Sequence, residues 1–157
     1  MSINKVKEYL KTFNKDNDIK ELNTSSATVE LAAAALNVIP ARIAKTLSFK
    51  KDNSCILVVT AGDTKIDNKK FKEEFGIKAK MLTCDEVPEI TGHPVGGVCP
   101  FAISNPDVKV YCDVSMHRFD TVFPACGTPN SAIELSCDEL FSISKSQKWV
   151  DVCLIKN

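Results

Sequence analysis

The hydrophobic positions near the start of the chain follow a helical spacing. Val6, Leu10 and Phe13 lie four and three residues apart, which predicts an amphipathic helix. Residues 19–22 then indicate a short strand. Over residues 25–36, Ser and Thr side chains that can cap a helix precede an alanine-rich run, and this combination predicts a second helix.

Apolar runs in the middle of the chain predict the strands of a sheet. Pro40 can begin a short helical turn, after which residues 43–49 alternate loosely between apolar and polar positions, as in a strand. Residues 55–60, C-I-L-V-V-T, form a β-branched, apolar run that is typical of a central strand. Further strands are predicted over residues 108–114, 121–125 and 131–135, and residues 149–155 close the chain.

Shorter helices are indicated by the residues at their ends. Asp67 can cap a helix that Gly76 closes at its C-terminal end. Residues 85–90 and 138–141 predict two more short helices. The chain has 157 residues, 44% of them apolar, with no repeat, linker or low-complexity segment, so we expect a single domain, 1–157, with one core. The fold class is α+β with a mixed sheet, and the pattern leaves the strand order open.

Charge and composition narrow the possible functions. The formal net charge is zero, so no overall field draws the protein to nucleic acid or to an anionic membrane. No apolar run reaches the roughly 18 residues of a membrane span, and residues 1–5 do not resemble a signal peptide. The seven cysteines are widely spread and include no C-x-x-C pair. We therefore expect a cytoplasmic protein with reduced, mostly buried thiols, no membrane partner and no metal.

The zero net charge hides an uneven distribution along the chain. Basic residues outnumber acidic ones over residues 42–80, and acidic residues outnumber basic ones over residues 81–157. Two interpretations remain open for the lysines at residues 65–80. They can form the solvated face of a helix, or a basic rim beside a pocket that contacts a phosphate backbone.

One lysine stands on an otherwise apolar stretch. Lys45 lies within P-A-R-I-A-K-T-L-S-F, so we expect its ammonium group to reach toward an anion or a strong acceptor. We expect no partner for it in the folded protein itself, and therefore little effect of its removal on stability. The alternative is a lysine at a strand edge that only prevents strand-to-strand aggregation.

The segment T-G-H-P-V-G-G-V-C-P-F contains a second candidate site. Gly96 and Gly97 can adopt positive φ and allow a ligand to approach the backbone, so that consecutive N–H groups point at one carbonyl or phosphate oxygen. Pro94 and Pro100 stiffen the ends of this loop. The alternative is a tight turn that needs glycine for its geometry alone. Cys99 is either a nucleophile or, without an evident base, a packed thiol.

Together these segments resemble a known family. The matching motifs follow one another in order over about residues 20–140: T-V-E-L-A-A-A-A-L, P-A-R-I-A-K-T-L-S-F, V-V-T-A-G-D, T-G-H-P-V-G-G-V-C-P-F, V-Y-C-D-V-S and A-C-G-T-P-N-S-A-I-E-L. In them the chain resembles the YbaK/ProX/EbsC family of aminoacyl-tRNA deacylases, which also occurs as the editing domain of bacterial prolyl-tRNA synthetases. The resemblance implies a single α+β domain whose mixed, barrel-like sheet is flanked by helices.

The resemblance also implies particular site residues. Lys45 matches the key lysine of the family, and Gly96 to Pro100 match its G-x-x-x-P loop, which holds the ester carbonyl through backbone amides. The implied catalytic positions are Lys45 and Gly97, and the implied substrate-binding positions are Thr46, His93, Gly96, Val98, Pro100, Asp113 and Gly127. Ala102, where relatives commonly carry glycine, and Cys126 depart from the family pattern and are expected to reshape the amino-acid pocket.

The implied activity is hydrolysis of a mischarged aminoacyl-tRNA, with cysteinyl- or alanyl-tRNA(Pro) as the expected substrate. The resemblance implies no cofactor, contact with the tRNA acceptor end, a possible association with prolyl-tRNA synthetase and a monomeric state. Activation of the attacking water can come from the substrate itself, since no catalytic triad is evident. Two alternatives remain: a tRNA- or synthetase-binding module without turnover, and a thiol centre at Cys99.

Overall fold

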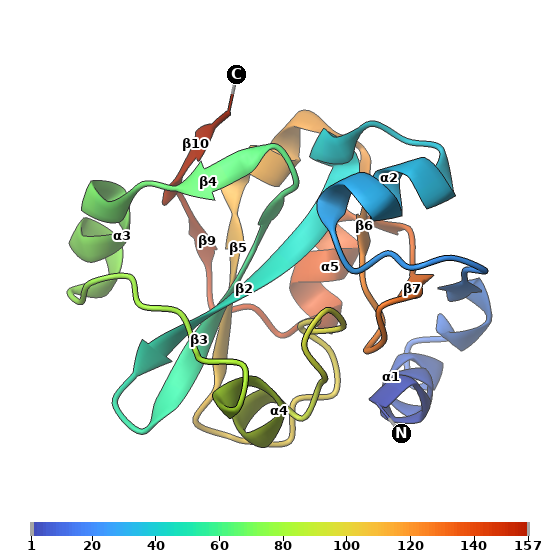
Figure 1. The fold of residues 1–157 in the computed structure, drawn as a ribbon, viewed down its shortest axis with the longest axis horizontal. Helices are drawn as coiled ribbons and strands as arrows, with labels where there is room; N and C mark the ends of the chain where they lie inside the picture. Colours follow the sequence, from blue (N-terminus) through green and yellow to red (C-terminus); the bar gives the residue numbers. More distant parts are fainter. Residues whose placement is uncertain (1, 157) are drawn as a thin grey trace.

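A curled, six-stranded sheet runs through the middle of the molecule, in the computed structural model that describes residues 2–156 (Figure 1). Its strand order is β8-β6-β2-β3-β5-β9. The bounds are β2 (Ile43–Lys51), β3 (Ser54–Ala61), β5 (Lys109–Asp113), β6 (Thr121–Pro124), β8 (Leu135–Ser136) and β9 (Trp149–Val150). The pairs β2–β3 and β6–β8 are antiparallel, whereas β2–β6, β3–β5 and β5–β9 are parallel. The predicted α+β fold with a mixed, barrel-like sheet is therefore confirmed.

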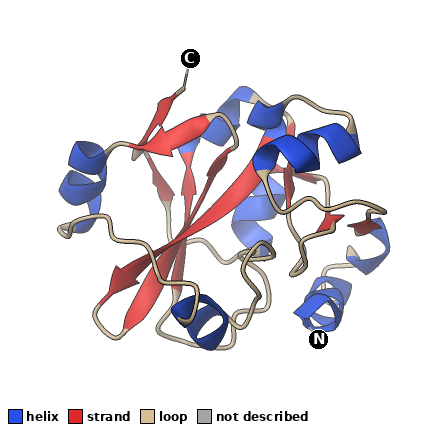
Figure 2. Ribbon diagram, viewed as in Figure 1, coloured by secondary structure: helices blue, strands red, loops and turns tan. Residues whose placement is uncertain are grey.

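Helices and two small sheets surround this central sheet (Figure 2). The helices are α1 (Ser2–Lys11), α2 (Val29–Leu36), α3 (Asn68–Phe75), α4 (Glu86–Thr91) and α5 (Cys137–Ile143), with 3-10 turns at Asp16–Asp18, Pro40–Arg42 and Val114–Arg118. In the small sheets, β1 (Lys20–Glu21) pairs with β7 (Ser131–Ala132), and β4 (Thr64–Ile66) pairs with β10 (Cys153–Ile155). Each of these small pairs joins segments that are far apart in the sequence.

The helix ends follow the local signals in the sequence. The Thr28 side chain accepts a hydrogen bond from the Leu31 N–H and caps α2, and Asp67 caps α3 in the same way. Gly76 ends α3 in the left-handed conformation that the sequence predicts. Ser136 begins α5 with a reciprocal capping box, a signal that the sequence analysis did not use.

The structure departs from the predicted elements where distant segments pair. The predicted strand over residues 131–135 is two strands, because β7 pairs with β1 and β8 pairs with β6. Strand β4 was not predicted, since only its distant partner β10 makes three residues into a strand. Helix α1 ends at Lys11, so Phe13 lies beyond it and is 37% exposed.

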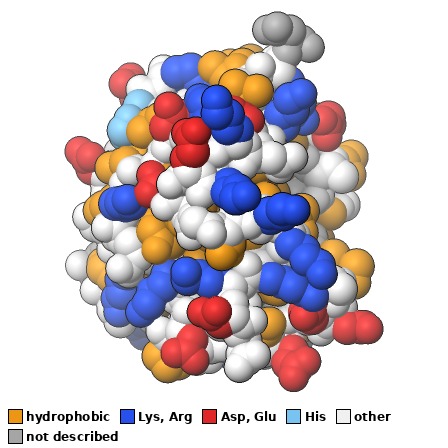
Figure 3. Space-filling view, turned by 90° about the vertical axis from the view of Figure 1, so that its left-hand side faces the viewer, with side chains coloured by type: hydrophobic (Ala, Val, Ile, Leu, Met, Phe, Trp, Pro, Cys, Tyr) orange, Lys and Arg blue, Asp and Glu red, His pale blue; other side chains and the backbone are white. Residues whose placement is uncertain are grey.

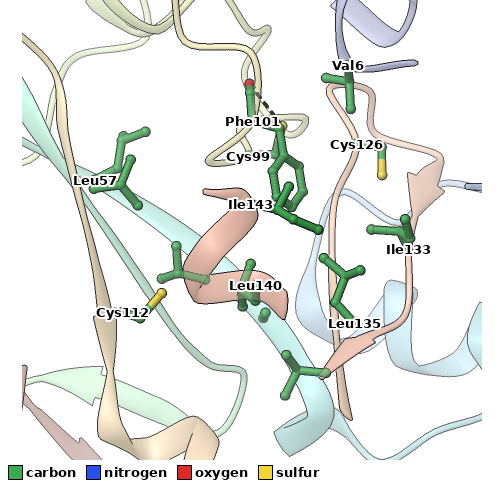
Figure 4. Packing of buried hydrophobic residues seen from close by; sticks show 14 of the residues in the cluster. Val6, Leu57, Cys99, Phe101, Cys112, Cys126, Ile133, Leu135, Leu140 and Ile143 are labelled. Atoms are coloured by element: carbon green, nitrogen blue, oxygen red, sulfur yellow. Dashed lines mark hydrogen bonds between the residues drawn. The ribbon is translucent and has the colours of Figure 1, made fainter. Parts of the chain in front are cut away.

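The apolar core fills both sides of the sheet. Strand β3 is buried from Cys55 to Ala61, as its continuous apolar run predicts. One side packs against α1 and α5 through residues that include Val6, Leu57 and Leu140, seen in Figure 4. The other side packs Phe71 of α3 against the sheet. All seven cysteines are free; Cys84 is exposed, Cys137 is half-buried and the remaining five are buried.

Candidate functional site: a cavity at the open edge of β2

The middle of β2 has an open edge. Strand β6 pairs with β2 only at Ile43 and Ala44, and the next backbone contact on this edge is the Leu82 N–H donating to the Ser48 carbonyl. In an antiparallel pair, the N–H and C=O of one residue both point toward the same neighbouring strand. Successive residues alternate between the two edges of the strand, so residues two apart face the same edge. The peptide groups of Thr46 therefore face the same edge as those of Ser48, away from β3.

A cavity of about 330 Å³ lies along this open edge. Its walls come from the N-terminal end of α2, the loop that follows α4, and the region of β6 and β7 (Figure 1). Of the residues that the sequence marks as site residues, Lys45, Thr46, Gly96 and Val98 line it together. These residues come from segments about fifty positions apart, so the fold brings the two candidate motifs to one place.

Two hydroxyl groups in this cavity are buried without a hydrogen-bond partner. They are Thr46 Oγ1 and Ser26 Oγ, and only Ser54 Oγ, at the start of β3, shares this state among residues 2–156. Leaving a buried hydroxyl unpaired costs about 1–3 kcal/mol, and such groups in native structures commonly await a ligand or water. Neither Ser26 nor the cavity residue Ser131 is among the site residues that the sequence predicts. A hydroxyl residue just before a helix, such as Ser26, has the ordinary interpretation of a helix cap.

The glycine loop supplies a wall of this cavity. Gly96 has a φ of +87°, whereas Gly97 is outside the positive-φ region, so only one of the pair uses that freedom. The Gly97 N–H donates to the Pro94 carbonyl at 3.0 Å and closes a turn. The N–H groups of Gly96 and Val98 have no acceptor within the described part of the chain. These two amides therefore keep an unused donor at residues that line the cavity, whereas the Gly97 amide is used within the turn.

Position 97 requires glycine because the backbone of a neighbouring segment leaves no room for a Cβ atom. A Cβ atom at this position would lie 2.8 Å from the backbone N and Cα of Thr128, and 2.9 Å from the carbonyl carbon of Gly127. The glycine loop therefore lies directly against the 127–128 backbone. Gly97 itself does not line the cavity, and its contact fixes the position of the wall formed by its neighbours.

Lys45 lines the cavity but has a partner in the folded protein. Its ammonium donates a hydrogen bond to the Thr64 carbonyl, at the start of β4. The expectation that no such partner exists was wrong, because β4 reaches Lys45 only through tertiary structure. Burial, and secondly the nearby Lys156, lower the pKa of Lys45. An ammonium group carries three donors, so two remain for a bound substrate.

Asp113 does not line this cavity, and its carboxylate is bound by backbone N–H groups. It is 1% exposed, and its carboxylate accepts hydrogen bonds from the N–H groups of Ser115 and Val152, both at 2.9 Å. It lines a different cavity, of about 390 Å³, that also includes Thr64 and Arg118. Thr64 lines this second cavity, and its carbonyl accepts the hydrogen bond from Lys45, which lines the first cavity. This hydrogen bond therefore joins the walls of the two cavities.

Three more of the predicted binding residues lie under α1, outside the cavity lining. His93 is 1% exposed; its Nε2–H donates to the Phe101 carbonyl at 2.8 Å, and its Nδ1 accepts from the Ser2 hydroxyl at 2.5 Å. Burial lowers the pKa of His93, which agrees with a neutral ring. Gly127 has a φ of +93° and lies against Ser2, where a Cβ would approach to 2.7 Å. Pro100 is buried beside a separate hollow. Their shared place indicates that α1 supports the glycine loop from behind.

The cysteine at the centre of the loop is part of the core. Cys99 is fully buried next to Phe101, and burial raises the pKa of its thiol to about 12 (Figure 4). Such a thiol stays protonated at neutral pH and is a poor nucleophile. Cys126 is also fully buried, and neither it nor Ala102 lines the cavity. The expected effect of these two residues on the pocket therefore has no direct contact to support it.

The backbone at Ala102 has a conformation that favours glycine. Its φ is +57°, a left-handed conformation that costs a non-glycine residue about 1–2 kcal/mol. We expect Ala102→Gly to raise the free energy of unfolding by about 1 kcal/mol, measured by urea denaturation. Asn37, also left-handed with a φ of 57°, is the matched control, because asparagine tolerates this conformation and Asn37→Gly should change stability little. Equal effects of the two substitutions would contradict this explanation.

Two wider features complete the description of the site. Residues 2–156 contain no group of three or more His, Cys, Asp or Glu side chains placed to hold a metal ion. No helix within the same range is long and apolar enough to cross a membrane. The cavity lining itself contains no His, Cys, Asp or Glu, so its polar groups are hydroxyls, one ammonium and backbone amides.

The part of the chain that forms this cavity matches a known protein family. Residues 24–143 match the family model described as the aminoacyl-tRNA editing domain, a range that contains every residue of the cavity lining. The chain is 54% identical over 154 residues to the uncharacterized protein YwhH of Bacillus subtilis strain 168, covering 98% of each chain. It is 36% identical over 88 residues to the proline–tRNA ligase of Solidesulfovibrio magneticus, which covers 55% of this chain and 15% of the ligase.

A solved structure agrees over almost the full length. A crystal structure described as "a putative trans-editing enzyme for prolyl tRNA synthetase" superimposes with a TM-score of 0.86 at 28% identity, covering 96% of both chains. The agreement includes α1 and the C-terminal strands, which lie outside the range of the family model. The whole fold, and not only the region of the motifs, is therefore shared with that protein.

Proposed function

Because the chain belongs to the aminoacyl-tRNA editing domain family, we propose that it is a deacylase that hydrolyses the ester of mischarged aminoacyl-tRNA in trans. The observation that carries this proposal is the cavity at the open edge of β2. Its lining combines Thr46, whose buried hydroxyl has no partner, with Gly96 and Val98, whose amides have no acceptor within the described residues. A site built from fixed donors and without a nucleophile suits a reaction that needs positioning and charge stabilisation.

The proposed roles follow from these donors. Water attacks the ester carbonyl, and the negative charge that develops on its oxygen is held by the Gly96 and Val98 amides. The two free donors of the Lys45 ammonium hold the terminal phosphate or the same carbonyl oxygen. The ester C–O bond then breaks, the ribose oxygen leaves with a proton, and the amino acid departs as its carboxylate. Thr46 and Ser26 hydroxyls orient the bound aminoacyl group.

The base that activates the water comes from the substrate in this proposal. The described cavity lining has no carboxylate, imidazole or thiol that could accept a proton. The ribose 2′-hydroxyl is adjacent to the ester and can direct a water molecule. In cysteinyl-tRNA, the substrate thiol can instead attack its own ester carbonyl: the ester C–O bond breaks, the thiol proton passes to the leaving ribose oxygen, and the cyclic thioester that forms is opened by water to the free amino acid.

The proposed substrate is a small amino acid. Apart from its hydroxyls and Lys45, the cavity is lined by apolar side chains, among them the bulky Ile43, Leu47, Met81 and Phe123, which limit the room for a side chain. A synthetase rejects an amino acid that lacks one methylene by only about 1–3 kcal/mol, so a second pocket for small residues improves fidelity. We propose cysteinyl- or alanyl-tRNA(Pro) as the substrate, cleaved in the cytoplasm after release from prolyl-tRNA synthetase.

A deacylation panel tests this function. Cysteinyl, alanyl, seryl and threonyl esters are each prepared on their own tRNA and on tRNA(Pro), and the loss of the ester is followed with time. We expect hydrolysis well above the uncatalysed rate for the cysteinyl or alanyl ester on tRNA(Pro). Esters that stay intact across the whole panel, in the presence of folded protein, would show that the proposal is wrong.

The same panel separates the deacylase from a binding module without turnover. A module without turnover would need an altered cavity, but Ala102 and Cys126, the two expected departures from the family pattern, do not line it. Binding of tRNA at low salt with no loss of ester would favour the module. A thiol centre at Cys99 predicts that Cys99→Ala abolishes hydrolysis, whereas the deacylase proposal predicts that activity is retained.

A further inference from the structure

Exposed lysines extend from the rim of the cavity across the face that carries α3. We call this group the lysine surface; its members are Lys51, Lys65, Lys69, Lys72, Lys78 and Lys80. None of them forms an ion pair within residues 2–156. Figure 3 shows this side of the molecule, with Lys and Arg side chains spread across its middle and acidic side chains mainly in its upper and lower parts.

Neighbouring basic residues on this face are already neutralised. Lys50 pairs with Glu86 at 3.1 Å, and Lys70 pairs with Asp151, also at 3.1 Å. Glu74 pairs with Lys148 at 2.7 Å, and Asp52, Asp67 and Glu73 of the same segments form no ion pair within residues 2–156. The six members of the lysine surface therefore keep their positive charge facing solvent, although the protein as a whole has a formal net charge of zero.

The chain itself connects this surface to the cavity. Met81 lines the cavity, and Lys80 and Lys78 lead directly away from it. The Lys80 carbonyl accepts a hydrogen bond from the Lys50 N–H, which fixes this segment against the end of β2. Lys69 and Lys72 lie on the exposed side of α3, and Phe71 lies on its buried side. In the direction of α4 the chain carries Asp85 and Glu89, which form no ion pair within residues 2–156, whereas Glu86 is paired with Lys50.

We infer that the lysine surface binds the phosphate backbone of the tRNA acceptor stem while the aminoacylated 3′ end occupies the cavity. This inference rests on the proposed function for the identity of the RNA. An acceptor stem is a polyanion that is wide enough to contact several lysines at once, and it must leave the cavity in one direction. The unpaired lysines on the α3 side attract the phosphates of the stem, and the acidic residues in and beside α4 repel them. The stem therefore leaves the cavity on the α3 side.

The inference has a measurable signature in salt dependence. Each phosphate contact that is neutralised releases counterions, so the logarithm of the binding constant falls with the logarithm of salt concentration by about 0.7–0.9 per contact. Point charges on lysines recognise phosphates without reading the bases. The binding should therefore be weak, salt-sensitive and largely independent of the stem sequence.

Binding of uncharged tRNA(Pro) to the full chain, followed by fluorescence anisotropy at several salt concentrations, tests the inference. We expect Lys78→Ala/Lys80→Ala to weaken binding at 50 mM salt by about tenfold and to reduce the salt slope by about 1.5. Lys69→Ala/Lys72→Ala should weaken it in the same manner. The matched control is Lys11→Ala/Lys20→Ala, which removes two exposed, unpaired lysines at the α1 end and should change affinity less than twofold.

The outcomes separate this inference from the proposed function. Equal weakening by the test and control pairs would overturn the inference, since it would mean that charge acts without regard to place. Unchanged binding in the Lys78/Lys80 pair would overturn it as well. Hydrolysis of a stemless alanyl- or cysteinyl-adenosine ester by the unmodified protein is measured alongside. Failure there, with tRNA binding that depends on the lysine surface, would count against the deacylase alone.

Discussion

Replacing Lys45 by alanine is expected to lower the rate of deacylation by about a hundredfold or more, the scale of losing one preorganised electrostatic contact. The ammonium lies at the cavity wall, held by the Thr64 carbonyl, and offers its remaining donors to the substrate. Single-turnover hydrolysis of the best ester in the panel measures this effect. Lys45→Arg should restore the charge without restoring the rate, because a planar guanidinium does not replace a compact ammonium.

The stability of these variants separates catalysis from folding. Because Lys45 has a partner in Thr64, Lys45→Ala should also lower the free energy of unfolding, by about 1–2 kcal/mol. Lys45→Met keeps the apolar stem and should lose less stability than Lys45→Ala while losing as much activity. Wild-type activity in Lys45→Ala would show that the proposed mechanism is wrong even if the protein is a deacylase.

The pH dependence of this lysine has a definite sign. Burial lowers the pKa of Lys45 below the ordinary lysine value of 10.5. Turnover that needs the ammonium should therefore decline as pH rises through that lowered pKa. The stability contribution has the opposite sign, because the unfolded chain binds more protons in the same window and folding becomes more favourable as pH rises. Lys45→Met should remove both dependences.

Gly97→Ala is expected to reduce activity by a comparable factor for a different reason. The added Cβ would lie 2.8 Å from the Thr128 backbone, so either the glycine loop or the 127–128 segment must move. A displacement of about 1 Å in a positioning element can cost about a hundredfold in rate. We also expect a loss of about 1–3 kcal/mol in stability, as for other overpacked sites. Rates from the deacylation panel and urea denaturation measure the two effects.

Gly76 provides the matched control for this substitution. It ends α3 with a φ of +72°, and a Cβ there would have no atom within 4 Å. Gly76→Ala should therefore cost about 1 kcal/mol through backbone strain and leave the rate of deacylation unchanged. If Gly97→Ala is as active as Gly76→Ala, the contact with Thr128 does not position the cavity wall.

Local signals in the sequence were sufficient for most of the individual elements. The continuous apolar run of β3, the caps at Thr28 and Asp67, and the Gly76 helix end all follow from short-range chemistry. The order of motifs along the chain identified the family, and with it the mixed, barrel-like sheet. Of the site residues that the family resemblance implies, Lys45, Thr46, Gly96 and Val98 line one cavity, and their roles stay predictions.

Tertiary structure decided what each of these residues contacts. Strand β4 exists because β10 pairs with it, and this pairing brings Thr64 to Lys45. Helix α1, from a distant part of the sequence, contacts His93 and Gly127 through Ser2, so these two residues lie against α1 and not in the cavity lining. The sequence by itself therefore determined the local elements and the family, because caps, turns and apolar runs act over a few residues. The open edge of β2 and the partners of Lys45 depend on where distant strands begin and end, which only the folded chain decides.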